Sequence, residues 1–157
     1  MIKRGSLMFA MALVIALLSA CSDDGGTGKV PTVAGLKDRM EQAADLSGMK
    51  QQDADKLQKL YGITADEIED FVLYTSTSNV KADELAIIKV KDASKTASVM
   101  ERIQQRIKAQ TVKFKDYRPK EYYLIEKHVL LSKGPLVFFA VSENAGRMDE
   151  AFNAAWK

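Results

Sequence analysis

The sequence predicts an α+β domain, with a mainly antiparallel four-stranded sheet made of two hairpins and helices packed on one face. Two stretches rich in β-branched and aromatic residues, 71–78 and 84–90, flank a short polar turn and predict the first hairpin. Stretches 128–133 and 136–142 flank Gly134-Pro135 and predict the second. Apolar residues at helical spacing between and around these pairs predict the helices that cover the sheet.

Two helices are expected before the first hairpin. Thr32 is a suitable N-cap for a helix that carries apolar residues at helical spacing, and Gly48 is expected to end it. Asp53 is a suitable N-cap for a second, short helix that Gly62 ends. These residues place helix boundaries by local chemistry alone.

Two further helices are expected. Asp92 precedes a helix over 93–110, and 143–156 forms the last. Between them, Pro119 starts a short turn through Glu126. The predicted buried stripe of helix 93–110 consists of Ala93, Ala97, Met100, Ile103 and Ile107.

The first 20 residues have the layout of a lipoprotein signal peptide. Lys3 and Arg4 precede an uncharged apolar run over 7–20, which as a helix is about 21 Å long and too short for a bilayer core of about 30 Å. The run ends in Leu18-Ser19-Ala20-Cys21, which resembles a bacterial lipobox. The resemblance implies that Cys21 carries a diacylglyceryl thioether, with palmitate-type acyl chains, and anchors the chain in the membrane.

This layout predicts three parts: a signal peptide over 1–20, a lipid-anchored flexible tether over 21–31, and a single α+β domain over 32–157. The expected location is the extracytoplasmic side of the cell membrane, as part of the cell envelope.

Composition limits the chemistry. The 157-residue chain has one Cys and one His, so it has no intramolecular disulfide, no cysteine-based zinc site and no multi-histidine metal site. Acylation of Cys21 also excludes thiol catalysis. His128 has no second catalytic feature near it, and Asp53 with Asp55 lacks the ligand ladder of a calcium loop. The sequence therefore assigns no catalytic, cofactor-binding or metal-binding residue.

Charge is distributed unevenly. Residues 22–94 hold 9 basic and 14 acidic residues, whereas residues 95–133 hold 10 basic and 4 acidic residues. In the second stretch, bases alternate with aromatic residues over 113–123, a pattern that suggests contact with an anionic envelope component or a protein partner. Export argues against nucleic acid. The competing interpretation is a solvated surface whose aromatic rings pack into the core. The candidate partner-binding residues are Arg102, Arg106, Lys113, Lys115, Tyr117 and Arg118.

The order of several segments resembles a family of bacterial lipoproteins known as a domain of unknown function. After the lipobox come KLYGITADEIEDFVLYTSTS (59–78), DELAIIKVKD (83–92), ERIQQRIKAQ (101–110), FKDYRP (114–119) and GPLVFFAVS (134–142). The similarity extends from about Leu36 to Phe152. It implies export, lipidation and a small extracytoplasmic domain, and it implies no catalytic residue or ligand.

Three hypotheses for function remain. The first is a lipid-anchored, non-catalytic binding or interaction module at the outer face of the cytoplasmic membrane. The second is a small envelope enzyme that uses carboxylates. The third is a solute-binding lipoprotein, which ranks last because the mature chain is too short for two lobes that close on a solute.

Overall fold

The computed structural model describes residues 29–156. The predicted signal peptide and the tether up to residue 28 lie outside these residues. The elements in chain order are α1 (Val33–Ala43), β1 (Met49–Gln51), α2 (Ala54–Tyr61), β2 (Ile68–Ser76), β3 (Glu84–Val90), the 3₁₀ turn η1 (Ala93–Lys95), α3 (Thr96–Phe114), α4 (Pro119–Glu126), β4 (Val129–Lys133), β5 (Leu136–Val141) and α5 (Ala145–Ala154).

The strands form one antiparallel sheet in the order β1-β2-β3-β5-β4. This confirms the α+β class and the two hairpins, β2–β3 and β4–β5. The predicted number of four strands is wrong, because β1 adds a fifth beside β2. Its three residues, Met-Lys-Gln, carry no β-branched or aromatic side chain, so no strand pattern marks them.

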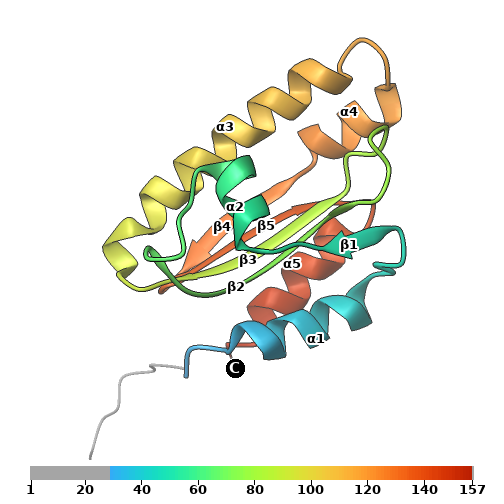
Figure 1. Ribbon diagram of the computed structural model, residues 1–157. Coiled ribbons are helices and arrows are strands. Elements are labelled where there is room, and N and C mark those ends of the chain that lie inside the picture. The colour runs from blue at the N-terminus through green and yellow to red at the C-terminus, as the bar shows by residue number, and fades with distance from the viewer. Residues whose placement is uncertain (1–28, 157) are drawn as a thin grey trace, which may run out of the picture.

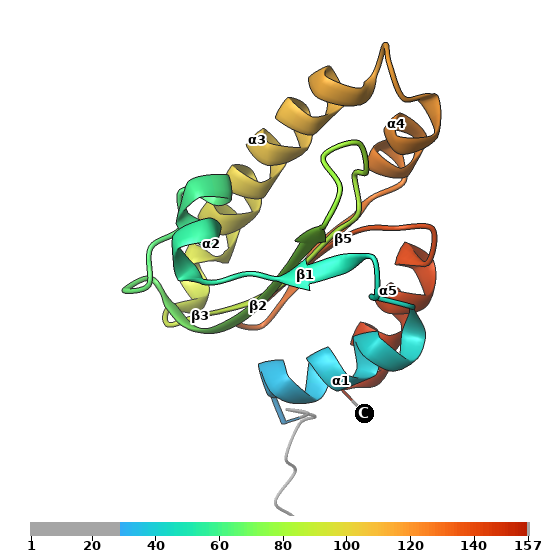
Figure 2. The same cartoon turned by 45° about the vertical axis from the view of Figure 1, so that its right-hand side comes forward.

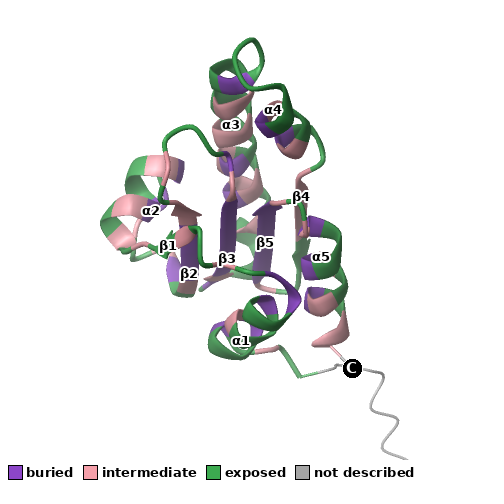
Figure 3. Cartoon of the chain, turned by 90° about the vertical axis from the view of Figure 1, so that its right-hand side faces the viewer, coloured by how far each residue is buried: buried purple, intermediate pink, exposed green. Residues whose placement is uncertain are grey.

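Helices cover both faces of the sheet, which corrects the prediction of helices on one face. Figures 1 and 2 show α2, α3 and α4 on one side of the strands and α1 with α5 on the other. The two central strands β3 and β5 are buried at consecutive positions, as Figure 3 shows. Consecutive side chains of a strand point to opposite faces, so both faces require a covering layer.

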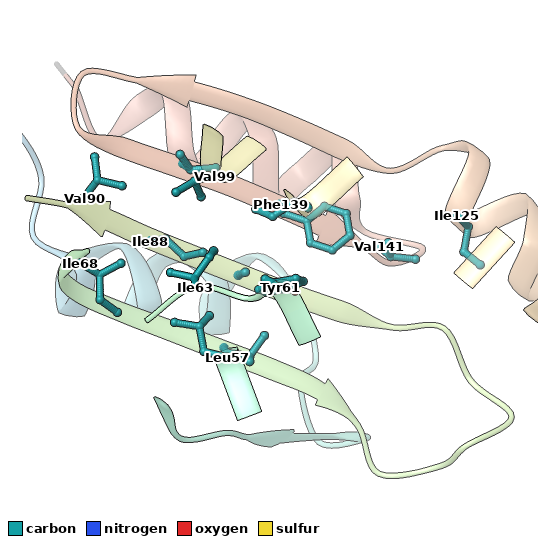
Figure 4. Packing of buried hydrophobic residues seen from close by; sticks show 14 of the residues in the cluster. Leu57, Tyr61, Ile63, Ile68, Ile88, Val90, Val99, Ile125, Phe139 and Val141 are labelled. Carbon is teal, nitrogen blue, oxygen red and sulfur yellow. The ribbon is translucent and has the colours of Figure 1, made fainter. Parts of the chain in front are cut away.

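Each face has its own hydrophobic cluster. Ile88 and Phe139 point to the side of α2 and α3, where Leu57 and Val99 pack against them (Figure 4). The neighbouring strand residues Ile87 and Phe138 belong to the cluster on the opposite face, together with residues of α1 and α5.

Local chemistry sets several helix ends as predicted, although Gly48 does not end the first helix, because α1 ends at Ala43. The side chains of Thr32, Asp53 and Asp92 accept hydrogen bonds from backbone N–H groups at the starts of α1, α2 and η1. Gly62 ends α2 with φ +67°, a left-handed conformation that favours glycine.

The predicted buried stripe of α3 is wrong at its N-terminal end. Ala93 and Ala97 are exposed, and Val99 is buried beside Ile103 instead. The 3₁₀ turn η1 precedes α3, and a 3₁₀ turn has three residues per turn where the prediction assumed 3.6.

Candidate functional site

Three connections of the chain meet at one end of the sheet, which we call the loop end. It comprises the β2–β3 loop (residues 77–83), the α3–α4 connection (residues 115–118) with α4, and the start of α5 (residues 142–146) (Figures 1 and 2). The start of α1 lies at the other end of the molecule in both views. The described chain therefore enters α1 on the side away from the loop end.

A buried carboxylate fixes the loop end. Glu121 of α4 is only 4% exposed, and its Oε2 accepts a hydrogen bond from the Ala82 backbone N–H at 2.8 Å. Its Oε1 accepts a hydrogen bond from Lys81 Nζ at 2.9 Å, and this bond raises the pKa of Lys81. Burial raises the pKa of nearby Asp83, and the charge of Glu121 adds to this effect. Glu121 thus holds the β2–β3 loop against α4.

A pocket of about 650 Å³ lies between α4 and the start of α5. Lys120 and Tyr123 of α4 line it, together with Lys127 just after that helix and Lys81 of the loop. Glu121 and Glu143 are its two carboxylates, but both oxygens of Glu121 already accept hydrogen bonds. Glu121 therefore has a structural role in holding Lys81 and Ala82.

A second pocket, about 270 Å³ in volume, lies on the other side of Lys81, and we call it the hydroxyl pocket. Its floor is the polar end of β2 and the start of the β2–β3 loop, and its walls come from α2 and α3. The residues that line it are Lys56, Leu60, Thr75, Ser76, Thr77, Ser78, Asn79, Lys81, Asp83, Glu84, Arg106, Gln110 and Lys113.

A buried polar network forms the inner wall of the hydroxyl pocket. Glu84 is 3% exposed and accepts hydrogen bonds from the Tyr61 hydroxyl at 2.5 Å and from Arg106 Nη2 at 2.8 Å. Burial raises the pKa of Tyr61 well above its usual value, and the charge of Glu84 raises it further. The network holds the Arg106 guanidinium in one orientation at the pocket.

Two of the six predicted partner-binding residues are engaged within the domain. Arg102 donates to Glu67 from Nη1 at 3.0 Å and from Nη2 at 2.5 Å, and Nη1 also donates to the Gly62 carbonyl at 2.9 Å. This pairing lowers the pKa of Glu67 to about 2. Arg106 is paired with Glu84 and still reaches the hydroxyl pocket. Arg102 lies outside the loop end.

The other four predicted residues lie close together at the C-terminal end of α3 and in the connection that follows. Lys113 lines the hydroxyl pocket, whereas Lys115, Tyr117 and Arg118 are exposed in the α3–α4 connection. Tyr117 is 82% exposed. Within residues 29–156, none of these four side chains forms an ion pair or a side-chain hydrogen bond; the Lys113 ammonium lies 4.8 Å from the ring centre of Phe114.

The structure divides the aromatic residues of segment 113–123 between two roles. Phe114 is buried, as the solvated-surface interpretation requires, but Tyr117 and Tyr123 are exposed. Val112 adds a further exposed apolar side chain, at 78%. The loop end and the adjoining end of α3 therefore present exposed aromatic, aliphatic and cationic groups.

Sequence reasoning missed the floor of the hydroxyl pocket and the role of Glu121. The apolar stretch that ends at Tyr74 is followed abruptly by the hydroxyl and amide side chains of Thr75–Asn79, while the β pattern continues. That change was the available signal for a polar surface at the end of β2. Glu121 had no such signal, because its partners Lys81 and Ala82 are about 40 residues away in sequence.

The residues for which the sequence suggested structural roles have such contacts. The Asp53 carboxylate accepts a hydrogen bond from the Lys56 backbone N–H and caps α2. His128 Nδ1 lies 2.6 Å from the Ile125 carbonyl oxygen, at the C-terminal end of α4. In the part of the chain that the structure describes, no three His, Cys, Asp or Glu residues are grouped as metal ligands. No helix there is both long and apolar enough to cross a bilayer.

Comparison with known families gives one match. The family model described as "Domain of unknown function (DUF4358)" matches residues 42–142, which is most of the domain, and the chain belongs to this family. This confirms the resemblance to a domain of unknown function, while the lipoprotein part of that resemblance stays a prediction. No curated protein and no solved structure matches the chain.

Proposed function

We propose that this member of the DUF4358 family is a lipid-anchored, extracytoplasmic binding module whose loop end binds an anionic component of the cell envelope or an acidic protein. Cys21 anchors it at the outer face of the cytoplasmic membrane, and the domain has no catalytic role. The proposal joins the signal features of the sequence to the chemistry of the loop end.

The exposed side chains of the α3–α4 connection are the observation that carries this proposal. Lys115 and Arg118 have no ion-pair partner among residues 29–156, and Tyr117 between them is almost fully exposed. Tyrosine and arginine are enriched at protein interfaces, where a planar side chain buries a large area and keeps a polar end. Unpaired cations beside it favour an anionic partner.

The position of the loop end supports a partner away from the anchoring membrane. The chain enters α1 at the far end of the molecule, so a lipid anchor that precedes α1 attaches to the domain at the end opposite to the loop end (Figures 1 and 2). The eight residues 22–29 of the tether have an average span of about 16 Å as a flexible chain.

The anchor is tested by labelling. Cells that express the full chain are fed a labelled fatty acid, and incorporation is compared between the natural protein and Cys21→Ala. We expect label in the natural protein and none in the variant. Equal labelling of both would refute the anchor at Cys21.

The binding surface is tested by crosslinking in intact cells from a photoreactive residue at Tyr117. We expect a crosslinked adduct whose yield falls when Lys115→Glu and Arg118→Glu are combined, and falls as ionic strength rises. The matched control combines Lys91→Glu and Lys95→Glu, two exposed lysines at the opposite end, and should keep the adduct. No adduct, or equal yield in both charge-reversed proteins, would contradict the proposal.

A further inference from the structure

The hydroxyl pocket is rich in hydrogen-bond donors that the domain itself does not use. Lys56 and Lys113 line it, and neither forms an ion pair within residues 29–156. Ser76 Oγ and Ser78 Oγ each accept a backbone hydrogen bond, from Ser78 N–H and Val80 N–H. Within the described residues neither hydroxyl donates, so both protons remain available to a ligand.

Arg106 adds an oriented donor group. Glu84 binds its guanidinium through Nε and Nη2, and Nη1 has no partner in the described part of the chain. Arg106 lines the hydroxyl pocket, and its pairing with the buried Glu84 carboxylate restricts the orientation of the guanidinium there. Such a fixed fork suits an anion with several oxygen atoms.

The charges of the pocket favour an anion. Four cationic side chains and two carboxylates line it. Glu84 is paired with Arg106, and Lys81 is paired with Glu121. Lys56 and Lys113 therefore exceed the one remaining acid, Asp83, whose charged form burial disfavours by raising its pKa.

We infer that the hydroxyl pocket binds a phosphate ester that carries neighbouring hydroxyl groups. The ammonium groups of Lys56 and Lys113 and Nη1 of Arg106 bind the phosphate oxygens, and the hydroxyls of Ser76 and Ser78 with the amides of Asn79 and Gln110 bind the polyol part. A tetrahedral phosphate accepts hydrogen bonds from several directions, and the pocket offers donors from α2, β2, the β2–β3 loop and α3. The volume of about 270 Å³ suits one such unit.

This inference rests on the proposed function, since it names the ligand chemistry recognised at the same end of the molecule. Two sources of a phosphate ester are available outside a cytoplasmic membrane: a polyol-phosphate polymer and a lipid headgroup. Both present the same group to the pocket, and the experiment separates them.

The test titrates the purified full chain, in detergent, with glycerol 3-phosphate, with glycerol and with sodium chloride at matched ionic strength. We expect saturable binding of glycerol 3-phosphate, with backbone NMR shifts at residues 76–79 and in the Arg106 side chain, and no saturable shifts with the other two. Lys56→Gln and Lys113→Gln should each weaken binding about tenfold, as expected for loss of a charge-assisted hydrogen bond. Lys95→Gln, an exposed lysine at the opposite end, is the control.

Absence of saturable binding, or equal shifts with chloride, would overturn the inference. Shifts confined to residues outside 76–79 and Arg106 would also overturn it. The NMR shifts are measured on the natural protein, so the inference stays testable even if a variant fails to fold. Soluble poly(glycerol phosphate) and phosphatidylglycerol vesicles are then each tested for competition with glycerol 3-phosphate. Competition by the polymer alone identifies the polymer as the source, and competition by the vesicles identifies the lipid headgroup.

The variants separate this inference from the proposed function. Lys56→Gln and Lys113→Gln act in the pocket, whereas Lys115→Glu and Arg118→Glu act in the α3–α4 connection. A crosslink from Tyr117 that Lys115→Glu with Arg118→Glu reduces, without any phosphate binding, would leave the proposed function in place and reject the pocket. Phosphate binding without a crosslink, or without lipidation of Cys21, would reject the proposed function and leave the inference about the pocket in place.

Discussion

The carboxylate of Glu84 lies almost fully buried between a tyrosine hydroxyl and a guanidinium. A buried charge is costly unless it is paired and hydrogen-bonded, and here Tyr61 and Arg106 supply both. Glu84 therefore accepts hydrogen bonds from side chains on two helices, Tyr61 of α2 and Arg106 of α3. Removing it leaves both partners without an acceptor.

We predict that Glu84→Ala lowers the free energy of unfolding by about 3 kcal/mol, because it leaves a partly buried guanidinium without its counter-charge. Tyr61→Phe, which removes one hydroxyl donor, should cost about 1 kcal/mol. Urea unfolding of each variant measures both values.

The combined variant Glu84→Leu with Arg106→Met should lose less stability than the sum of the two single changes, because the pair is removed together. A cost below about 1 kcal/mol for Glu84→Ala would show that the ion pair does not stabilise the domain in this way.

Glu67 is the second residue whose environment shifts its chemistry. The side-chain hydrogen bonds from Arg102 lower its pKa to about 2 from the ordinary 4.5, and the Thr64 backbone N–H contributes. The folded state therefore favours the charged carboxylate. Its contribution to stability is fully present above about pH 4.5 and is lost as the pH falls toward 2.

We predict that Glu67→Gln destabilises the protein by about 1 kcal/mol at pH 6, the upper end for a partly exposed pair, and that the difference from the natural protein disappears as the pH approaches 2. Urea unfolding at several pH values measures it. Asp66→Asn, an exposed neighbour in the same loop, is the control and should show no such convergence. A constant difference across this pH range would refute the role of the Glu67 charge.

At the scale of elements, α4 and the β2–β3 loop act as one unit through Glu121. Within the loop, the backbone hydrogen bond from Lys81 N–H to the Ser78 carbonyl is long, at 3.3 Å. Internal backbone hydrogen bonds therefore hold the loop only weakly. Its attachment to α4 by Ala82 and Lys81 therefore fixes the wall that separates the two pockets.

We predict that Glu121→Ala frees the β2–β3 loop. Hydrogen exchange of the Ala82 amide should accelerate at least tenfold, because the loss of a charge-assisted hydrogen bond lowers the cost of local opening. Glu126→Ala is the control and should leave the Ala82 amide protected, because among residues 29–156 the lost carboxylate bonds only the Tyr122 hydroxyl of the same helix. Unchanged exchange in Glu121→Ala would mean that the loop is held by other contacts.

For the whole molecule, coverage of both sheet faces is what stability depends on. The face of α1 and α5 is covered in part by Val33, Leu36 and Met40, which are 2% exposed or less. Burial of such a side chain is worth roughly 2 kcal/mol, so three of them approach the net stability of a small domain.

We predict that a chain starting at residue 29 unfolds at the same urea concentration as the full chain, whereas a chain starting at residue 46 loses about 5 kcal/mol or fails to fold. The two truncations differ only in α1 and its flanks, so each is the control for the other. Equal stability of both would show that α1 is not part of the folded core.

Much of the fold follows from short stretches of sequence. Caps and glycines act within a few residues, so Thr32, Asp53 and Gly62 mark helix ends without reference to the rest of the chain. The hairpin turn at Gly134, with φ +55°, is equally local. The continuous apolar run over 136–141 also predicts burial on both faces, and assigning the helices to one face overlooked it.

Only the tertiary structure decided the rest, because it depends on contacts between distant residues. Strand β1 exists through pairing with Tyr74–Ser76, since its own three residues have no strand preference. Arg102, Arg106, Lys113 and Lys115 look alike in sequence, yet acidic partners 20 or more residues away bind the first two and leave the others free within residues 29–156. The sequence by itself determined most of the elements and the basic character of segment 95–133. The folded chain decided which charges remain available to a ligand, because an ion pair forms only where folding brings its two charges together.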